Sequence, residues 1–362
     1  MTNMPELTIE DIAIKAGVSR STVSRVLNGK SNVRDETRQS ILAVIKETGY
    51  RPHAAARTLA SQRSETIGLV LPLSVSVFFA DPYFPNLIKG IAQGCNDHNY
   101  TLALFLAGTP EDQTKLFSRV SQKGQVDGVI IQSGHHGDQS IIHELSQTSI
   151  PVMVAGRPTQ PEGINYIDVD NVAASQMAVE HLIKLGHRRI ATITGPLEGT
   201  VGSDRLEGYR TALTNVGIEI DPDLIITGDF TEAGGHTAFK KLLPAKPDAL
   251  FAASDSMAVG AIHAVREAGW LIPEDLAVVG FDDLPIANVF DINLTTVRQP
   301  VVDFGVAAVA GLIDMIKHGR KRGLHICMGT ELVIRDTCGA HTMQVNDYSI
   351  NEMRENQRIF DE

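Results

Sequence analysis

Cysteine is scarce in this chain: its 362 residues include only Cys95, Cys327 and Cys338, which lie far apart. An odd number of widely spaced cysteines excludes a disulfide framework and fits no zinc-knuckle spacing. We therefore expect three free thiols, either buried or on the surface.

Long apolar runs are missing too. No stretch reaches the roughly 20 apolar residues that a membrane-spanning helix needs. The N-terminus carries acidic side chains where a secretory signal needs basic residues followed by an apolar stretch. We therefore expect a cytoplasmic protein without a membrane partner.

The signatures of common catalytic sites are also absent. No G-x-G-x-x-G follows an expected strand, no Walker pattern is present and no G-x-S-x-G elbow occurs. His135, His136 and His143 match no metal-binding spacing, and we interpret them as loop and helix residues. The sequence thus predicts no cofactor, no metal and no enzymatic activity.

What the chain does have is an uneven distribution of charge. The formal net charge is -11, but residues 1–63 alone sum to +4 and the remainder to -15. A small basic module on a large acidic body indicates that the module meets phosphate groups while the body is repelled from nucleic acid.

Residues 1–50 are expected to form three helices. Thr8 is a good N-cap for the first helix, and Gly17 permits the left-handed turn that ends it. The helical pattern resumes over 20–28 and again over 35–48. The short connection between the first two helices predicts a helix-turn-helix.

The second of these helices carries polar and basic side chains at its N-terminal end: Arg20, Ser21, Ser24 and Arg25. Donors placed in this way can enter the major groove of DNA and contact base edges. The alternative is a three-helix domain whose arginines are only solvated.

The segment 8–61 resembles the DNA-binding headpiece of the lactose repressor/galactose repressor (LacI/GalR) family, from TIEDIAIKAGVSRSTVSRVLN to YRPHAAARTLAS. The resemblance implies that Arg20, Ser21 and Arg25 read operator bases. It further implies that four residues contact phosphates or orient the headpiece: Thr8, Asn28, Asn32 and Thr37.

Residues 51–64 are expected to form a hinge with a short helix, which is marginal by itself in water. In the family, two such helices lie side by side in the minor groove and a leucine wedges between base pairs. The matching residue here is Leu59. A flexible linker remains the alternative.

Residues 65–340 predict an α/β core. Apolar runs that lack alternation, as in strands buried on both faces, are separated by helical stretches. The runs are 66–71, 100–106, 126–132, 151–155, 189–194, 248–253 and 276–282. An interruption near 168–172 predicts two Rossmann-like subdomains with a cleft between them at the carboxyl ends of the strands. The first comprises about 65–168 and 298–327, the second about 169–297 and 328–340, and 341–362 form a tail.

Five residues are candidates for a sugar site, because sugars are bound by aromatic faces and by charged planar groups. Tyr83 and Phe84 follow the first strand, Phe230 follows a later one, Arg205 is placed in a loop before a helix, and Asp282 ends a strand. The alternatives are that the aromatic rings belong to the core and that Arg205 pairs structurally with Asp204 or Asp282.

The stretch 65–338 resembles the effector-binding core of the same family, which is similar to periplasmic sugar-binding proteins. DPYFPNLIKGI, LGHRRIA, DRLEGYR, SDSMAVGA and VVGFDD carry this resemblance. It implies that the five candidates contact the effector, with Ser254 and Asp255 as second-rank candidates. Gly199 and Val201 stand where the purine-binding member has polar or charged residues, which argues against a purine.

These observations predict a ligand-responsive repressor of carbohydrate-utilisation genes that binds a palindromic operator as a homodimer. The dimer is favoured because the tail over 341–362 lacks the leucine heptads of tetrameric members. The alternative is a cytoplasmic sugar-binding protein or enzyme with an incidental headpiece. The identity of the effector, the operator and the sign of regulation stay open.

Overall fold

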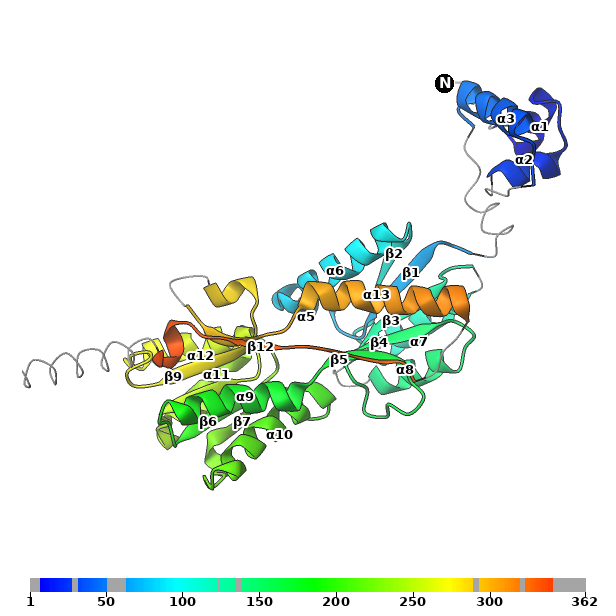
Figure 1. Cartoon of the computed structure of the whole chain (residues 1–362). Coiled ribbons are helices and arrows are strands. Elements are labelled where there is room, and N and C mark those ends of the chain that lie inside the picture. The colour runs from blue at the N-terminus through cyan, green and yellow to red at the C-terminus, as the bar shows by residue number, and fades with distance from the viewer. Residues whose placement is uncertain are drawn as a thin grey trace, which may run out of the picture. The chain divides into compact units, whose positions relative to one another are not determined.

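The computed structural model describes residues 7–27, 32–50, 63–122, 124–133, 138–288, 293–319 and 323–340. The chain divides into two compact units, Met1–Ser64 and Glu65–Glu362 (Figure 1). Nearly all of the predicted hinge and the whole predicted tail lie outside the described residues. None of the helices in the described part of the chain has the length and apolarity that crossing a membrane requires.

The first unit is a three-helix domain with a helix-turn-helix. Its helices are α1 (Ile9–Lys15), α2 (Arg20–Leu27) and α3 (Asp35–Thr48). Thr8 Oγ1 accepts a hydrogen bond from the Asp11 N–H, and the Thr8 N–H donates to Asp11 Oδ2, so a reciprocal capping box starts α1. Gly17 has a φ of 64° between α1 and α2. The core of this unit consists of Ile12, Ala13, Val23, Val26 and Ile41.

The second unit contains two six-stranded sheets. The first sheet is entirely parallel and has the order β11-β5-β4-β3-β1-β2. Its strands are β1 (Thr66–Leu71), β2 (Thr101–Leu106), β3 (Gly128–Gln132), β4 (Val152–Ala155), β5 (Tyr166–Val169) and β11 (His325–Met328). Helices α6 (Tyr83–Asp97) and α13 (Val301–His318) cover one face, and α7 (Pro110–Val120) and α8 (Asp138–Ser146) cover the other. The short α5 (Val75–Ala80) precedes α6.

The second sheet repeats this arrangement in the order β12-β10-β9-β8-β6-β7. Its strands are β6 (Ile190–Thr194), β7 (Ile225–Thr227), β8 (Ala249–Ala252), β9 (Ala277–Asp282), β10 (Thr295–Arg298) and β12 (Glu331–Val333), of which only β12 is antiparallel to its neighbour. Helices α9 (Asn171–Lys184) and α10 (Thr200–Asn215) pack on one face, and α11 (Glu232–Leu242) and α12 (Asp255–Glu267) pack on the other. Four short 3-10 helices complete the described elements: Pro222–Leu224, Leu243–Ala245, Pro285–Asn288 and Asp336–Cys338.

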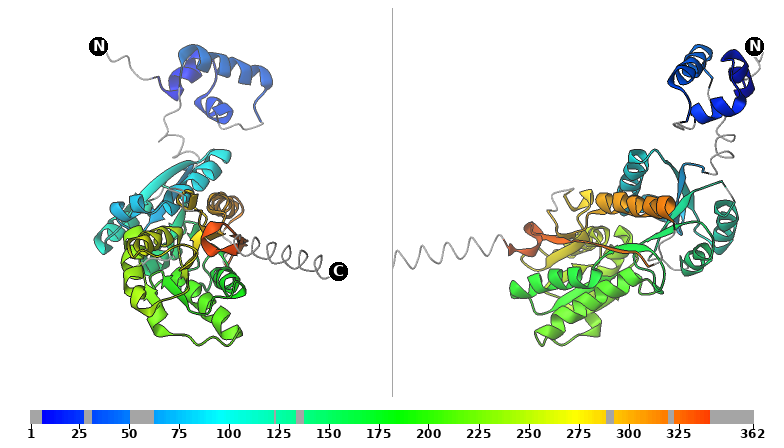
Figure 2. Two further views of the ribbon diagram at one scale, coloured as in Figure 1. Left: turned by 90° about the vertical axis from the view of Figure 1, so that its left-hand side faces the viewer. Right: turned by 45° about the vertical axis from the view of Figure 1, so that its right-hand side comes forward.

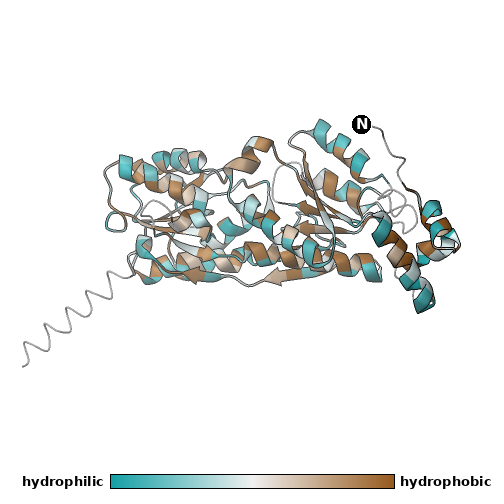
Figure 3. Ribbon diagram, turned by 90° about the horizontal axis from the view of Figure 1, so that it is seen from above, coloured by the Kyte–Doolittle hydropathy of each residue, from teal (hydrophilic) through white to brown (hydrophobic). Residues whose placement is uncertain are grey.

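The two sheets confirm the predicted fold class, and burial explains the composition of their strands. Figure 3 shows strands that are mostly hydrophobic and helices that carry both hydrophobic and hydrophilic residues. In β1, Ile67, Leu69 and Leu71 belong to the core under α6 and α13, while Val70 belongs to the core on the opposite face. Strands buried on both faces therefore read as continuous apolar runs.

Within the described ranges, the chain passes between the sheets three times. It leaves the first sheet after β5 to begin α9, returns between β10 and α13, and crosses again between β11 and β12. Figure 2 shows α13, late in the chain, lying against elements of the first sheet. Each sheet is thus assembled from segments that are distant in the sequence.

The apolar runs named in the sequence analysis omit β5, β7, β10, β11 and β12, which have three or four residues each. The edge strands β7 and β11 contain exposed or half-buried residues, so neither has the continuous apolar run of a strand buried on both faces. The chain crosses back to the first sheet only after Arg298, where β10 ends.

The packing of α6 against α13 depends on glycine. A Cβ built on Gly90 would lie 2.0 Å from the carbonyl oxygen of Val302, which is backbone and has no rotamer to change. We expect Gly90→Ala to lower the free energy of unfolding by about 3 kcal/mol, because the helices must move apart. Chemical denaturation measures this loss. Gln93→Ala, on the exposed side of the same helix, should stay within about 0.5 kcal/mol of the wild type. Equal stability of the two variants would contradict the close contact.

Candidate functional site

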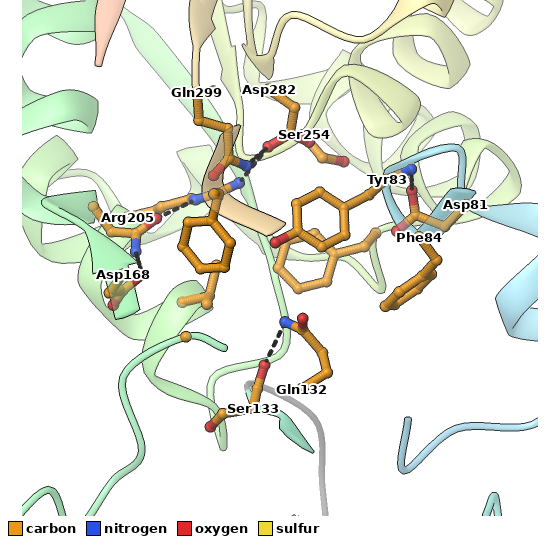
Figure 4. A pocket seen from close by; sticks show the side chains of 15 residues that line it. Asp81, Tyr83, Phe84, Gln132, Ser133, Asp168, Arg205, Ser254, Asp282 and Gln299 are labelled. Atoms are coloured by element: carbon orange, nitrogen blue, oxygen red, sulfur yellow. Dashed lines mark hydrogen bonds and ion pairs between the residues drawn. The ribbon is translucent and has the colours of Figure 1, made fainter. Parts of the chain in front are cut away.

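A pocket lies between the two sheets, and its wall is built largely where strands end (Figure 4). Residues that follow or end β3, β4, β7, β8, β9 and β10 all reach it, as expected for an α/β fold with its ligand site at the carboxyl edge. Its lining residues are Asp81, Tyr83, Phe84, Gln132, Ser133, Gly156, Asp168, Asn171, Val201, Arg205, Phe230, Ser254, Asp282, Gln299 and Phe304.

The guanidinium of Arg205 is buried in the second-sheet side of this wall. Its Nε donates to Asn171 Oδ1 over 2.9 Å, and its Nη1 donates to the Ala253 carbonyl over 2.5 Å. The same Nη1 lies 3.4 Å from Asp282 Oδ1, and the guanidinium stacks 3.6 Å from the centroid of the Phe281 ring. Burial lowers the pKa of Arg205, while the charge of Asp282 opposes that shift.

Asp282, at the end of β9, has a strained backbone conformation. Its φ is 119° and that of Asp283 is 54°, both in a region that side chains rarely adopt. Asp283 is anchored by ion pairs of 2.6 Å to Arg298 and 2.6 Å to Arg335. The turn thereby aims the Asp282 carboxylate into the pocket, where its Oδ1 also accepts a 2.5 Å hydrogen bond from Gln299.

Aromatic rings supply the apolar part of the wall. Tyr83 and Phe84 start α6 and meet edge to face at 5.6 Å. Phe230 follows β7 with a φ of 65° and lies over Gly195, where a Cβ would come within 2.0 Å of the ring. Gly195 is therefore the residue that leaves room for Phe230.

A chain of polar contacts joins the two sides of the pocket. Asp168 of β5 accepts hydrogen bonds from the Arg157 N–H and from Asn171 Nδ2, and Asn171 in turn accepts from Arg205. The Arg157 guanidinium, on the loop after β4, binds both carboxylate oxygens of Asp204 on α10, at 2.7 and 2.6 Å. The first sheet is thus tied to the second beside the pocket.

The carboxyl groups in the wall are harder to ionise than usual. Burial raises the pKa of Asp81 to about 6, and a hydrogen bond from the Tyr83 N–H limits the shift. Burial likewise raises the pKa of Asp168 to about 6 and raises the pKa of Asp282, which the Arg205 charge opposes. The pKa of the Tyr83 hydroxyl is raised by burial and then by the negative charge of Asp282.

Six of the seven effector candidates lie in the pocket wall: Tyr83, Phe84, Arg205, Phe230, Ser254 and Asp282. The expected loop position of Arg205 was wrong, because the residue lies within α10. The structural pairing with Asp282, which was the alternative to an effector role, is present, whereas Asp204 pairs with Arg157.

Asp255 was misplaced by the sequence analysis. It is fully buried behind the wall, where its Oδ1 accepts from Thr296 Oγ1 and its Oδ2 accepts from the Leu284 N–H. Both carboxylate oxygens are used inside the second unit, so Asp255 supports the turn after β9 and does not line the pocket.

The sequence analysis missed several polar lining residues, among them Asp81, Gln132, Asp168 and Gln299. Gln132 and Gln299 could have been found, because each stands at the carboxyl end of a strand or just after it. Asp81 had no such signal, since it precedes α6 on a connection whose path depends on α5.

In the first unit, Arg20, Ser21 and Arg25 are exposed on α2 and Ser24 is half-buried there. Arg20 Nε lies 2.9 Å from Glu10 Oε1 on α1, and Ser21 Oγ lies 2.8 Å from Ser19 Oγ. Thr8 caps α1, Asn32 is exposed and Thr37 is half-buried on α3. Asn28 and Leu59 lie outside the described residues.

Comparison with known proteins relates both units to regulators of transcription. Residues 8–53 match the model of bacterial regulatory proteins of the lacI family, and 179–338 match that of the periplasmic binding protein-like domain. The chain is 36% identical over 334 residues to the HTH-type transcriptional regulator CelR of Thermobifida fusca, covering 91% of this chain and 98% of the relative.

Solved structures agree. The complex of the transcriptional regulator CelR with cellobiose has a TM-score of 0.73 and 34% identity, covering 91% of this chain and 99% of that one. The lac repressor dimer bound to operator and the anti-inducer ONPF has a TM-score of 0.78 and 28% identity, covering 92% of this chain and 99% of that one.

The raised pKa of Asp81 predicts that Asp81→Asn increases the free energy of unfolding by an amount that depends on pH. A carboxyl whose pKa rises from 3.8 to about 6 on folding contributes stability below pH 3.8 that is lost as the pH rises through 6. We expect the free energy of unfolding of Asp81→Asn to exceed that of the wild type by about 1–2 kcal/mol at pH 7.5, and this difference to shrink toward pH 5. Urea denaturation at both pH values tests this. Asp97→Asn, exposed on α6, serves as the control, and an equal gain at both pH values would refute the assignment.

Proposed function

The chain belongs to the lacI family of bacterial regulatory proteins, and from this premise we propose that it represses carbohydrate-utilisation genes and responds to a sugar bound in the pocket. As a member of this family it is a DNA-binding transcriptional regulator and not an enzyme. The observation that carries the sugar proposal is the pocket itself, where rings and buried polar groups from both sheets converge.

The pocket wall has the chemistry that sugar recognition needs. Sugar rings have apolar C–H faces, which pack on aromatic side chains, and hydroxyl groups, which both donate and accept hydrogen bonds. Tyr83, Phe84 and Phe230 supply the rings, and Arg205 and Asp282 supply a planar cation and a carboxylate. The solved CelR complex, in which a similar protein holds cellobiose, supports the same class of ligand.

The response follows from the position of the pocket between the sheets. A sugar that touches both Tyr83 on α6 and Arg205 on α10 favours one angle between the two sheets, since the chain crosses between them at only three places among the described residues. The sugar then changes operator affinity by its differential affinity for the two arrangements, and operator DNA changes sugar affinity by the same factor.

On the DNA side, we propose that α2 enters the major groove of a palindromic operator and that the chain binds it as a homodimer. The exposed donors Arg20, Ser21 and Arg25 support this docking. Leu59 is proposed to wedge into the minor groove at the centre of the operator. The lac repressor, solved as a dimer on its operator, supports the arrangement.

Arg25 is expected to contact a guanine edge. Arg25→Ala should cost about 1–3 kcal/mol on an operator selected from random DNA, and should relax the preference at one base pair. The comparison is made by gel shift on the selected operator and on random duplexes. Lys46→Ala, exposed on α3, removes the same charge and should leave that base preference intact. An equal loss on both kinds of DNA would make Arg25 a phosphate contact only.

Arg205 is expected to be necessary for release by sugar. Arg205→Lys keeps the positive charge but loses the planar fork, so the sugar concentration needed for release should rise at least about tenfold while sugar-free operator binding is kept. Arg210→Lys, exposed on the same helix, is the matched control. Operator titrations with and without a sugar found by thermal-shift screening give the result, and release of Arg205→Lys at the wild-type concentration would remove Arg205 from the sugar site.

A further inference from the structure

One polar atom in the pocket wall lacks a partner. Gln132, at the end of β3, is 5% exposed, and its Nε2 donates to the Ser133 carbonyl over 2.9 Å. A carbonyl can only accept, which fixes the orientation of the amide and leaves Oε1 as an acceptor. Within the described residues, that buried Oε1 has no hydrogen-bond partner. A buried acceptor without a donor is unfavourable, so the site is completed by a ligand that donates.

The carboxylates add further acceptors to the same wall. Asp81 uses Oδ1 for the Tyr83 N–H, and Asp282 uses Oδ1 for both Gln299 and Arg205. No hydrogen bond found among the described residues occupies Oδ2 of either carboxylate. The pocket therefore presents at least three acceptor atoms to its ligand.

Positive charge is limited by comparison. Among the described lining residues, Arg205 is the only cationic side chain, against the carboxylates of Asp81, Asp168 and Asp282. Nε and Nη1 of Arg205 are already engaged by Asn171, Ala253 and Asp282. A phosphate or carboxylate on the ligand would meet more like charge than opposite charge among largely buried side chains, where such repulsion is strong.

We propose that the pocket selects an uncharged sugar whose hydroxyl groups donate to Gln132 Oε1 and Asp81, and that the Asp81 carboxylate excludes sugars bearing phosphate or carboxylate groups. This inference rests on the proposed sugar response and names the class of sugar. It assigns Asp81 as a residue that determines specificity.

The first test compares matched ligands on the full-length protein by isothermal titration calorimetry. Glucose, ribose and cellobiose are paired with glucose 6-phosphate, ribose 5-phosphate and cellobionate. We expect at least one neutral sugar to bind at least about 100-fold more tightly than its anionic partner. An anionic sugar that binds as tightly as its neutral partner overturns this inference and leaves the sugar response standing. Binding of none of the six overturns the sugar response, and this inference with it.

The second test isolates Asp81. Asp81→Asn keeps the acceptor for the Tyr83 N–H and removes the charge, so the preference for the neutral sugar should fall about tenfold. Asp97→Asn, exposed at the C-terminal end of α6, should leave the preference unchanged. An unchanged preference in Asp81→Asn shows that another group sets the charge selectivity and overturns the assignment.

The third test separates ligand binding by Gln132 from a structural role. Gln132→Met fills a similar volume without the unpaired acceptor, so thermal stability should be kept or raised while Kd for the neutral sugar rises about tenfold. Unchanged sugar affinity in a variant of wild-type stability would overturn the role of Oε1.

Discussion

A guanidinium withdrawn from water organises the pocket. An isolated buried charge is strongly unfavourable, so every contact of Arg205 must offset its lost hydration. The contacts come from α9 through Asn171, from the end of β8 through the Ala253 carbonyl, and from β9 through Asp282 and the Phe281 ring. The carboxyl ends of neighbouring strands are therefore fixed around one side chain, and the ligand meets a preformed wall.

Hydrogen bonds connect the surroundings of Arg205 to the first sheet in two places. Asp282 binds Gln299, which stands between β10 and α13, where the chain passes to the other sheet. Asn171 donates a hydrogen bond to Asp168, which lies in β5 beside the crossing that follows this strand. Asp168 also accepts a hydrogen bond from the Arg157 N–H. A ligand that alters the surroundings of Arg205 thus acts next to the segments that connect the sheets. The pocket and these connecting segments share hydrogen bonds, so the proposed change of angle between the sheets needs no long pathway.

The sequence allowed the class of fold and part of the pocket to be predicted, for physical reasons visible in single residues. Strands such as β1 are buried on both faces and are continuous apolar runs, whereas the edge strand β7 is short and partly exposed and so escaped notice. Asp282 was found because it ends a buried strand. Asp255 has the same chemical character, but its partners Thr296 and Leu284 are distant in sequence, so its turn-supporting role could not be seen. The unpaired acceptor of Gln132 exists only because the Ser133 carbonyl orients its amide.

The interleaved path of the chain has an evolutionary consequence. Pocket residues are drawn from positions between Asp81 and Phe304, and both sheets are built from separated segments, so a recombination point within the core divides the pocket. The DNA-binding unit instead ends at Ser64, before the first strand of the core. A single recombination event at this boundary exchanges a whole DNA-binding unit between relatives. Recombination at this boundary can pair an existing pocket with a new DNA-binding unit in a single event, whereas a change within the pocket itself requires substitutions at positions scattered along the core.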